Sequence, residues 1–154
     1  MHASAAESLL QYLHPKARVL DIGSGSGYLT HVLANLIGDG DTEGKVVGLD
    51  HIPELVDLAN SNMGKSEEGR KMLETGKYDA IHVGAAAATL HAELIDQLKS
   101  PGRLFIPVED NKGYGDQWIW VVDKDENGKV TQKKKEGVRY VPLTDAPKKK
   151  IGLF

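Results

Sequence analysis

The stretch VLDIGSGSGYLT, residues 19–30, constrains the fold of this chain more than any other part of its sequence. An apolar run with Asp21 near its end is followed by Gly23, Gly25 and Gly27, and then by a helical pattern. Such a run is typical of a buried parallel strand. Glycine adopts positive φ easily, and it lets a ligand approach the backbone closely. The stretch therefore predicts a strand, a tight turn and a helix, with a ligand at the turn.

A second acid lies where such a ligand would need it. The strand-like run KVVGLD, residues 45–50, ends in Asp50. Ligands of parallel sheets bind beyond the carboxyl ends of the strands. An acid that ends the second strand is placed to accept the hydroxyls of a ribose. Together, Asp50 and the glycines predict a nucleotide-like ligand, although each feature alone also fits a purely structural turn or strand cap.

The rest of the chain alternates helical and strand-like patterns. Apolar residues at helical spacing predict helices over residues 3–13, 28–37, from 53 onward, and 91–99. Buried strands are predicted over residues 18–22, 78–85 and 102–108, and a hairpin about the turn Asn127-Gly128 over 117–143. We expect one α/β domain over residues 1–154, with a Rossmann-like, doubly wound, mainly parallel sheet and a C-terminal antiparallel hairpin.

Two of the predicted helices have a defined inward face. The residues expected to point inward are Leu9, Leu10 and Leu13 in the first helix and Leu94, Ile95 and Leu98 in the last. His82, within an apolar strand, is expected to be a packed core histidine and not a ligand. The six histidines show no metal-ligand spacing, so no metal site is expected.

Composition excludes several classes of protein. No apolar run approaches the roughly 18 residues of a membrane span. The N-terminus has neither a cationic lead nor a long apolar stretch, so a secretory signal is not expected. The chain has no cysteine, which excludes disulfides and thiolate chemistry and fits a reducing compartment. A soluble, cytoplasmic, monomeric protein is expected.

Basic residues gather near the C-terminus, in the runs Lys133–Lys135 and Lys148–Lys150. No aromatic residues alternate with them, and such runs are typical of solvated faces. Nucleic acid is therefore not the expected partner.

The glycine spacing also discriminates among nucleotides. Dinucleotide folds prefer G-x-G-x-x-G, whereas this chain has Gly23-x-Gly25-x-Gly27 preceded by Asp21. That pattern resembles the first motif of class I methyltransferases, whose ligand is S-adenosylmethionine. An acid near the turn suits this ligand because its sulfur is positively charged.

Six blocks in the same order extend the resemblance to one family, the protein-L-isoaspartate O-methyltransferases. The blocks are MHASAAESL, VLDIGSGSGYLT, VVGLDHIPELVDLA, YDAIHVGAAA, LIDQLKSPGRLFIPV and GVRYVPLTD. The resemblance implies methyl transfer from S-adenosylmethionine to the α-carboxylate of isoaspartyl residues in damaged proteins, with S-adenosylhomocysteine as product. This chemistry needs little acid or base help, because the acceptor is already ionised and positioning does most of the work.

The resemblance also implies roles for particular residues. The cofactor would be bound by Asp21, Gly23, Ser24, Gly25, Gly27, Asp50, His51 and Thr144. The substrate would be covered by Val138, Tyr140, Val141, Pro142 and Leu143. Two structural alternatives stay open: His51 can cap the second helix, and Ala85–Ala88 can serve close packing alone.

Two departures from the family bear on activity. The family has a sizeable segment before MHA that contacts the substrate, and a strand with a GDGR-type motif before YDAIHVG; neither is found in this sequence. Without that strand, the helix from Pro53 must itself cross back over the first strand, and the second strand offers an edge to another chain. Methyl transfer is still the expected reaction, and whether it is weak or absent in this shortened chain stays open. The alternatives are an inactive nucleotide-binding module and a methyltransferase acting on another substrate, such as nucleic acid.

Overall fold

The computed structural model describes residues 2–38, 43–50, 77–110 and 115–143. Along the chain the elements are α1 (His2–Leu9), η1 (Leu10–Tyr12), β1 (Arg18–Ile22), α2 (Tyr28–Leu36), β2 (Lys45–Leu49), β3 (Tyr78–Val83), α5 (Ala92–Asp96), β4 (Leu98–Glu109), β5 (Gln117–Lys124) and β6 (Val130–Val138). The helix predicted from Pro53 and its crossover lie outside the described residues.

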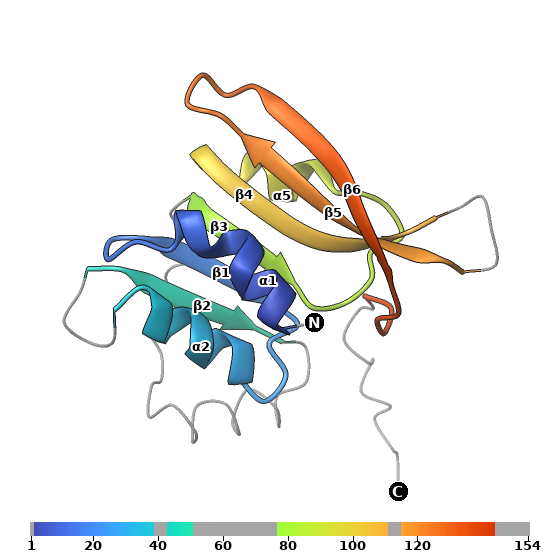
Figure 1. Cartoon of the computed structure of the whole chain (residues 1–154), viewed down its shortest axis with the longest axis horizontal. Helices are drawn as coiled ribbons and strands as arrows, with labels where there is room; N and C mark the ends of the chain where they lie inside the picture. The colour runs from blue at the N-terminus through green and yellow to red at the C-terminus, as the bar shows by residue number, and fades with distance from the viewer. Residues whose placement is uncertain (1, 39–42, 51–76, 111–114, 144–154) are drawn as a thin grey trace, which may run out of the picture.

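The strands form a single six-stranded sheet in the order β2-β1-β3-β4-β5-β6 (Figure 1). The pairs among the first four strands are parallel. The pairs β4–β5 and β5–β6 are antiparallel. The predicted mainly parallel sheet with a C-terminal hairpin is confirmed. The carboxyl ends of β1, β2 and β3 meet at the same edge of the sheet, which is where ligands of such sheets bind.

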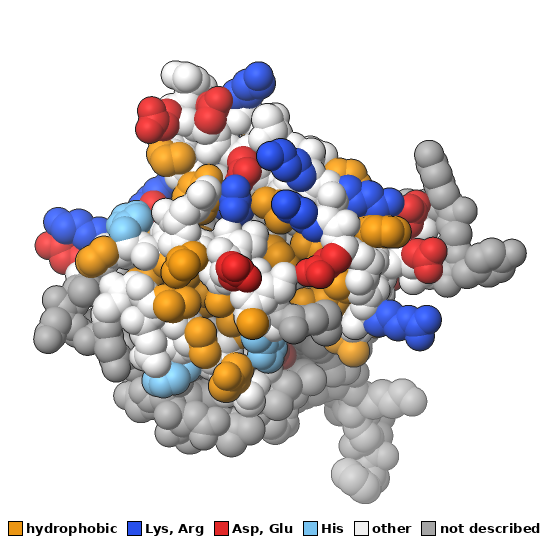
Figure 2. Space-filling model, viewed as in Figure 1, with side chains coloured by type: hydrophobic (Ala, Val, Ile, Leu, Met, Phe, Trp, Pro, Cys, Tyr) orange, Lys and Arg blue, Asp and Glu red, His pale blue; other side chains and the backbone are white. Residues whose placement is uncertain are grey.

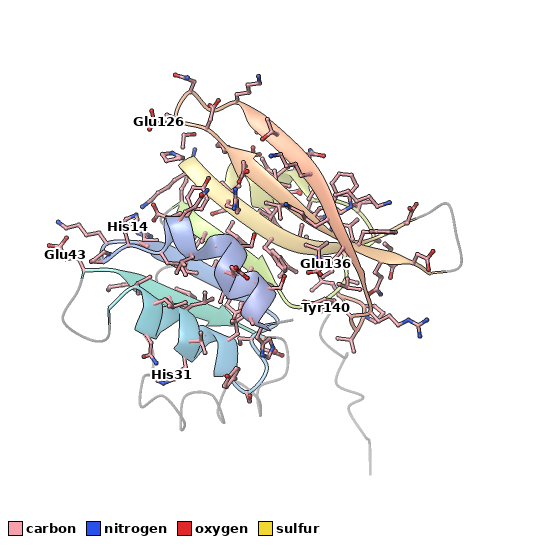
Figure 3. The ribbon with its side chains drawn as sticks, in the orientation of Figure 1. His14, His31, Glu43, Glu126, Glu136 and Tyr140 are labelled. Carbon is pink, nitrogen blue, oxygen red and sulfur yellow. The ribbon has the colours of Figure 1, made fainter. Side chains whose placement is uncertain are left out.

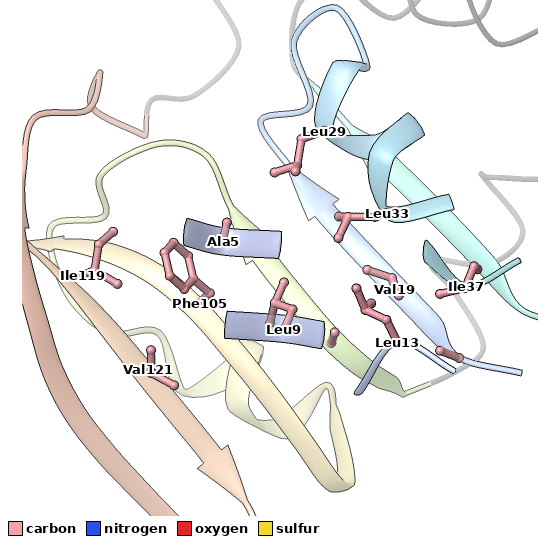
Figure 4. Close-up of a cluster of buried hydrophobic side chains, with 12 residues drawn as sticks. Ala5, Leu9, Leu13, Val19, Leu29, Leu33, Ile37, Phe105, Ile119 and Val121 are labelled. Atoms are coloured by element: carbon pink, nitrogen blue, oxygen red, sulfur yellow. The ribbon is translucent and has the colours of Figure 1, made fainter. Parts of the chain in front are cut away.

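Helices cover both faces of this sheet. α1 and α2 lie on one face and α5 lies on the other (Figure 1). The core on the α1 and α2 side is drawn in Figure 4 and includes the fully buried Leu9 and Leu33. The core on the α5 side includes Leu98 and Leu104. Burying each such leucine stabilises the fold by about 1.5–3 kcal/mol.

The helix after the glycine turn follows from its sequence. Leu29, Leu33 and Ile37 recur every four residues and are all buried, which gives α2 one apolar face against the sheet. Gly27 precedes the helix with a φ of 82°, and Gly38 follows it with a φ of 99°. Both conformations favour glycine. The helix ends at Leu36, one residue before the predicted end.

Two predicted inward residues are placed differently by the structure. Leu10 is 52% exposed whereas Leu9 and Leu13 are buried, because a neighbour on a helix points about 100° away from the residue before it. Leu98 is buried, as predicted, but as the first residue of β4, where its register partner is Tyr78. Strand pairing with β3 therefore ends the last predicted helix early, at Asp96.

The predicted hairpin turn is confirmed. Gly128 has a φ of 80°, as a turn of this kind requires. The Asp125 side chain accepts hydrogen bonds from the amides of Asn127 and Lys129, each at 2.9 Å. The aspartate therefore stabilises the turn that joins β5 to β6.

The surface over α1 and α2 is mixed. Hydrophobic side chains gather in the middle of this face with acidic side chains among them, and Lys and Arg side chains lie above and to either side (Figure 2). Exposed apolar residues of these two helices and η1 include Leu10, Tyr28 and Leu36. No helix in the described ranges combines the length and apolar character that a membrane crossing requires.

Candidate ligand site at the carboxyl edge of the sheet

The three glycines after β1 form a turn whose backbone conformation other residue types would adopt only with strain. Gly23, Gly25 and Gly27 have φ values of 76°, 56° and 82°. L side chains rarely adopt such positive values. Within the described part of the chain, a β-carbon at Gly25 would meet nothing within 4 Å. No described residue therefore crowds the backbone of Gly25 on this side, and a ligand could approach it closely.

The turn is fastened to the end of β2. The amides of Gly23 and Ser24 donate to the Leu49 carbonyl at 2.7 and 3.1 Å. The Gly25 amide donates to Asp50 Oδ2 at 2.9 Å. The structure thus brings together the glycine turn and the acid at the end of the second strand, since Gly25 and Asp50 lie 25 residues apart in sequence. These amides have partners within the protein, and the partners fix the shape of the turn.

The first turn of α2 completes this edge. Gly27 is the N-cap residue, and no side-chain hydrogen bond caps the helix within the described part of the chain. The first amides of a helix have no partner inside it, and they carry the positive end of its dipole. This helix start can therefore interact with the polar groups of a ligand at the turn.

Asp21 lies inside the protein and not at its surface. It is 1% exposed. One carboxylate oxygen accepts a hydrogen bond from Thr30 Oγ1 at 2.6 Å, and the other lies 2.7 Å from His82 Nδ1. A direct contact of Asp21 with the cofactor stays a prediction.

His82 is confirmed as a packed core histidine. It is 3% exposed, and its ring stacks on Phe105 with centroids 5.9 Å apart.

Gly48 of β2 and Gly84, directly after β3, leave room for the glycine turn and for Thr30. A β-carbon at Gly84 would come within 2.9 Å of the Gly23 carbonyl, and one at Gly48 within 3.1 Å of the Ser24 and Thr30 side chains.

The segment predicted to cover the substrate lies beside the loop that follows β3. The Ala86 amide donates to the Val141 carbonyl at 2.8 Å, and the Leu143 amide donates to the Ala86 carbonyl at 2.7 Å. Ala86 and Pro142 form a parallel bridge. Val141 is 72% exposed and Leu143 is 40% exposed. A short apolar stretch is thus presented to solvent next to the end of β3.

The alanine stretch after β3 does more than pack closely. Ala85, Ala86 and Ala87 are buried, whereas Ala88 is exposed. Ala87 bridges to β4, since its amide donates to the Pro107 carbonyl and its carbonyl accepts from the Glu109 amide. The stretch therefore connects the 141–143 segment to the carboxyl end of β4.

Tyr140 anchors the start of this segment, near the end of β6 (Figure 3). Its amide donates to Gln117 Oε1, and its carbonyl accepts from Gln117 Nε2 at 3.0 Å. Burial and the nearby Glu136 carboxylate raise the pKa of the Tyr140 phenol above its usual value. Val138 and Tyr140 pack against the core on the α1 side. These contacts fasten the chain just before the 141–143 segment to the core.

Two predicted residues, His51 and Thr144, lie outside the described residues. Sequence reasoning did not assign a role to Thr30, Gly48 or Gly84, although all three shape the turn. Thr30 occupies the third helical position, where a hydroxyl in an apolar helix start was an available signal. Gly84 follows β3 directly, as Gly23 follows β1, and this parallel was also available.

A separate cleft of about 650 Å³ opens between α1 and strands β4–β6. Its floor includes Phe105, Ile119 and Val121. None of the glycines of the turn lines it.

In the described ranges, no three metal-ligating side chains gather as a metal site would need.

The sequence and the fold of this chain are similar to those of known proteins. The sequence profile of the family described as protein-L-isoaspartate(D-aspartate) O-methyltransferase, PCMT, matches residues 1–148. Protein-L-isoaspartate O-methyltransferase 2 of Arabidopsis thaliana is 45% identical over 160 residues, covering 94% of this chain and 50% of that relative. The protein-L-isoaspartate O-methyltransferase of Caenorhabditis elegans is 42% identical over 159 residues, covering 94% of this chain and 68% of that relative.

A solved structure, described as PCMT from Plasmodium falciparum in complex with S-adenosyl-L-homocysteine, superposes with a TM-score of 0.80 at 31% identity. The match covers 94% of this chain and 73% of that one. The chain spans half of the first Arabidopsis relative and 66% of a second, protein-L-isoaspartate O-methyltransferase 1. The resemblance drawn from the six sequence blocks is confirmed: the chain belongs to the protein-L-isoaspartate(D-aspartate) O-methyltransferase family.

Proposed function

We propose that this chain binds S-adenosylmethionine at the glycine turn and transfers its methyl group to the α-carboxylate of L-isoaspartyl residues in damaged proteins. Family membership supports the reaction. One observation carries the site: the Gly25 amide donates to the Asp50 carboxylate at 2.9 Å. This contact joins the predicted ribose acid to the predicted cofactor turn.

The residues at the turn fit such a cofactor. Apart from its chain neighbours, no described residue lies within 4 Å of the β-carbon position at Gly25, and the adjacent helix start suits polar groups. Asp50 lies at the carboxyl end of β2, within reach of a sugar bound over the turn. When bound, S-adenosylmethionine supplies a methyl group on a positively charged sulfur, and S-adenosylhomocysteine is the product.

The chain's own contribution is positioning. A substrate carboxylate is ionised at neutral pH, so no general base is needed to activate it. Holding the two reactants in line provides most of the acceleration available to such a site. The 141–143 segment, held to Ala86 by two hydrogen bonds, would orient the peptide beside the turn. Val141 and Leu143 would contact apolar parts of that peptide.

A binding module without catalysis is the second candidate. The chain spans 50% to 66% of the length of the first two relatives, so the activity of those longer proteins does not by itself extend to it. Such a module would keep the turn and Asp50 as its cofactor site. It would bind the cofactor and release no methylated product.

Calorimetric titration with S-adenosylhomocysteine tests the site. We expect saturable binding, and we expect Asp50→Ala to weaken it at least tenfold, the loss that corresponds to one hydrogen bond to a charged group. Asp96→Ala is the matched control, since Asp96 is an exposed carboxylate at the end of α5. Absence of binding by the unmodified chain would rule out the proposed site.

Transfer of a labelled methyl group tests the reaction. We expect incorporation into an isoaspartyl peptide and none into the same peptide with ordinary aspartate. Binding without transfer at high protein concentration would favour the binding module. Transfer to a nucleic acid instead would support a methyltransferase that acts on nucleic acid.

We infer further that residues 1–154 act as one monomeric domain in the cytoplasm. The single sheet that joins all the described strands supports one domain. A lack of cysteine suits a reducing compartment. Light scattering of the purified chain would test the monomer, and a dimer would overturn it.

A further inference from the structure

Four strands contribute one residue each to a row that crosses the sheet at the level of the turn. Asp21 of β1 has Gly48 of β2 and His82 of β3 as its register partners. His82 in turn has Phe105 of β4 as its partner. Register partners on neighbouring strands lie side by side on the same face. The row therefore places a carboxylate, an imidazole and an aromatic ring in sequence beneath the glycine turn.

The carboxylate in this row is enclosed and bonded on both oxygens. Asp21 is 1% exposed, Thr30 is 3% exposed and His82 is 3% exposed. Thr30 Oγ1 donates to one oxygen at 2.6 Å, and His82 Nδ1 lies 2.7 Å from the other. A buried carboxylate without partners would be costly, so these two contacts hold it in place.

The same contacts connect three elements that must keep their relative positions for a ligand to bind. Asp21 lies two residues before Gly23, Thr30 is in the first turn of α2, and His82 is near the end of β3. Thr30 Oγ1 would also lie 3.1 Å from a β-carbon at Gly48. The hydroxyl thus occupies the space that Gly48 leaves open on β2.

We propose that Thr30 and His82 are positioning residues for cofactor binding, and that they act through Asp21, which sets the geometry of the glycine turn and the start of α2 without contacting the cofactor. The inference rests on the proposed function, since it concerns the same site. It assigns Asp21 a role different from the direct contact that the sequence motif suggested. It also gives Thr30 and His82 a role in binding.

Two ways in which Asp21 could act make different predictions. If Asp21 attracted the cofactor by charge, it would favour the sulfonium of S-adenosylmethionine over the uncharged sulfur of S-adenosylhomocysteine. If it acts by holding the turn, both nucleosides lose affinity equally when the contacts are removed. We therefore expect Asp21→Asn and Thr30→Val to weaken both ligands by the same factor, about tenfold, the size of one buried hydrogen bond.

The substitutions at Thr30 isolate the hydroxyl. Thr30→Val keeps the shape of the side chain and removes the donor to Asp21, whereas Thr30→Ser keeps the donor. We expect the serine variant to bind like the unmodified chain. At His82, we expect Asn to retain more affinity than Leu, since its amide nitrogen can take the place of Nδ1.

A second measurement does not depend on the cofactor. Hydrogen exchange of the Gly23, Ser24 and Gly25 amides, relative to the Leu20 amide in β1, reports local opening of the turn. We expect Thr30→Val to raise this ratio about tenfold, in line with the loss of one hydrogen bond. Asp79→Asn is the matched control. Asp79 is also a buried, hydrogen-bonded aspartate, but it lies near the amino end of β3, away from the glycine turn.

The outcomes separate the two proposals. If the unmodified chain binds neither nucleoside, the proposed function fails, while the exchange ratio still tests the role of Thr30. If Thr30→Val leaves the exchange ratio of the turn unchanged, the positioning role is overturned. A larger loss for S-adenosylmethionine than for S-adenosylhomocysteine in Asp21→Asn would overturn it too, in favour of a charge effect.

Discussion

Two buried aspartates of neighbouring strands lie near opposite strand ends and have different surroundings. The carboxyl edge and the amino edge of the sheet are the sides where the parallel strands end and begin. Asp21, at the carboxyl edge, is 1% exposed and is held by the Thr30 hydroxyl and the His82 ring. Asp79, at the amino edge, is 8% exposed. Its carboxylate accepts hydrogen bonds from the Arg18 amide and Lys99 Nζ, each at 2.7 Å, and lies 3.3 Å from His14 Nε2.

The difference shows how one side chain can serve two purposes. The partners of Asp79 include a charged lysine and a half-exposed histidine, which is labelled at one end of the molecule in Figure 3. Their contacts tie β3 to β1, to β4 and to the turn after η1, so they contribute mainly to stability. The partners of Asp21 are buried and surround the glycine turn. We therefore expect changes at the amino edge to alter stability alone, and changes at the carboxyl edge to alter binding as well.

The largest effect is expected from a methyl group at either edge. A β-carbon at Gly84 would come within 2.9 Å of the Gly23 carbonyl, and one at Gly102 within 2.7 Å of the Lys99 carbonyl. Because backbone must move in both cases, we expect Gly84→Ala and Gly102→Ala each to cost up to about 3 kcal/mol, measured by urea unfolding. Only Gly84→Ala should also weaken S-adenosylhomocysteine in calorimetry. Equal affinity of the two variants for S-adenosylhomocysteine would contradict the expected difference between the carboxyl and amino edges.

A somewhat smaller effect is expected at Asp79. Asp79→Asn removes the charge that Lys99 and the Arg18 amide contact. We expect the free energy of unfolding to fall by about 2 kcal/mol, the range for hydrogen bonds to a charged group. Cofactor affinity should not change below the melting transition. A loss of affinity larger than twofold would show that the two edges are coupled.

The contribution of Asp79 should depend on pH. Burial favours its neutral form, but hydrogen bonds from the Arg18 amide and Lys99 outweigh this and hold the pKa of Asp79 below its usual value. A carboxyl with a lowered pKa stabilises the fold above the pKa of the unfolded chain, about 4, and loses this contribution as pH falls further. The difference in unfolding free energy between the unmodified chain and Asp79→Asn should thus be full at pH 6 and shrink below pH of about 4. A constant difference from pH 6 to pH 3 would contradict this assignment.

The smallest effect is expected at His14. Its side chain is 51% exposed, and its contact with Asp79 is 3.3 Å long. Exposed pairs of this kind contribute little, so His14→Gln should change the free energy of unfolding by less than about 0.5 kcal/mol. His82→Gln, at the buried counterpart, should cost several times more. Similar values from thermal unfolding of the two variants would show that burial does not separate these histidines.

Much of the fold could be predicted from local patterns. The strand over residues 18–22 and the helix start at Tyr28 are found where the sequence places them, because apolar spacing and glycine act within a few residues. The same holds for the Asn127-Gly128 turn. The end of the last helix could not be predicted in this way, because Leu98 pairs with Tyr78 of another strand.

The candidate site divides in the same manner. The glycines and Asp50 stand out in the sequence by type and spacing. The hydrogen bond from the Gly25 amide to Asp50 shows that they lie close together, as that spacing suggested. The sequence did not reveal that Asp21 is enclosed or that Thr30 and His82 are its partners. These contacts join residues 9 and 61 positions apart, and nothing in the local pattern encodes such pairings.

The sequence by itself determined the family, the strand, turn and helix around the glycines, and the mixed sheet, because each depends on residue type and short-range spacing. Only the tertiary structure decided which of these groups are buried and which lie at the glycine turn. It directs Asp21 into the protein and Asp50 onto the turn, since strand register and the packing of α2 against β1 and β2 choose the partners of each carboxylate.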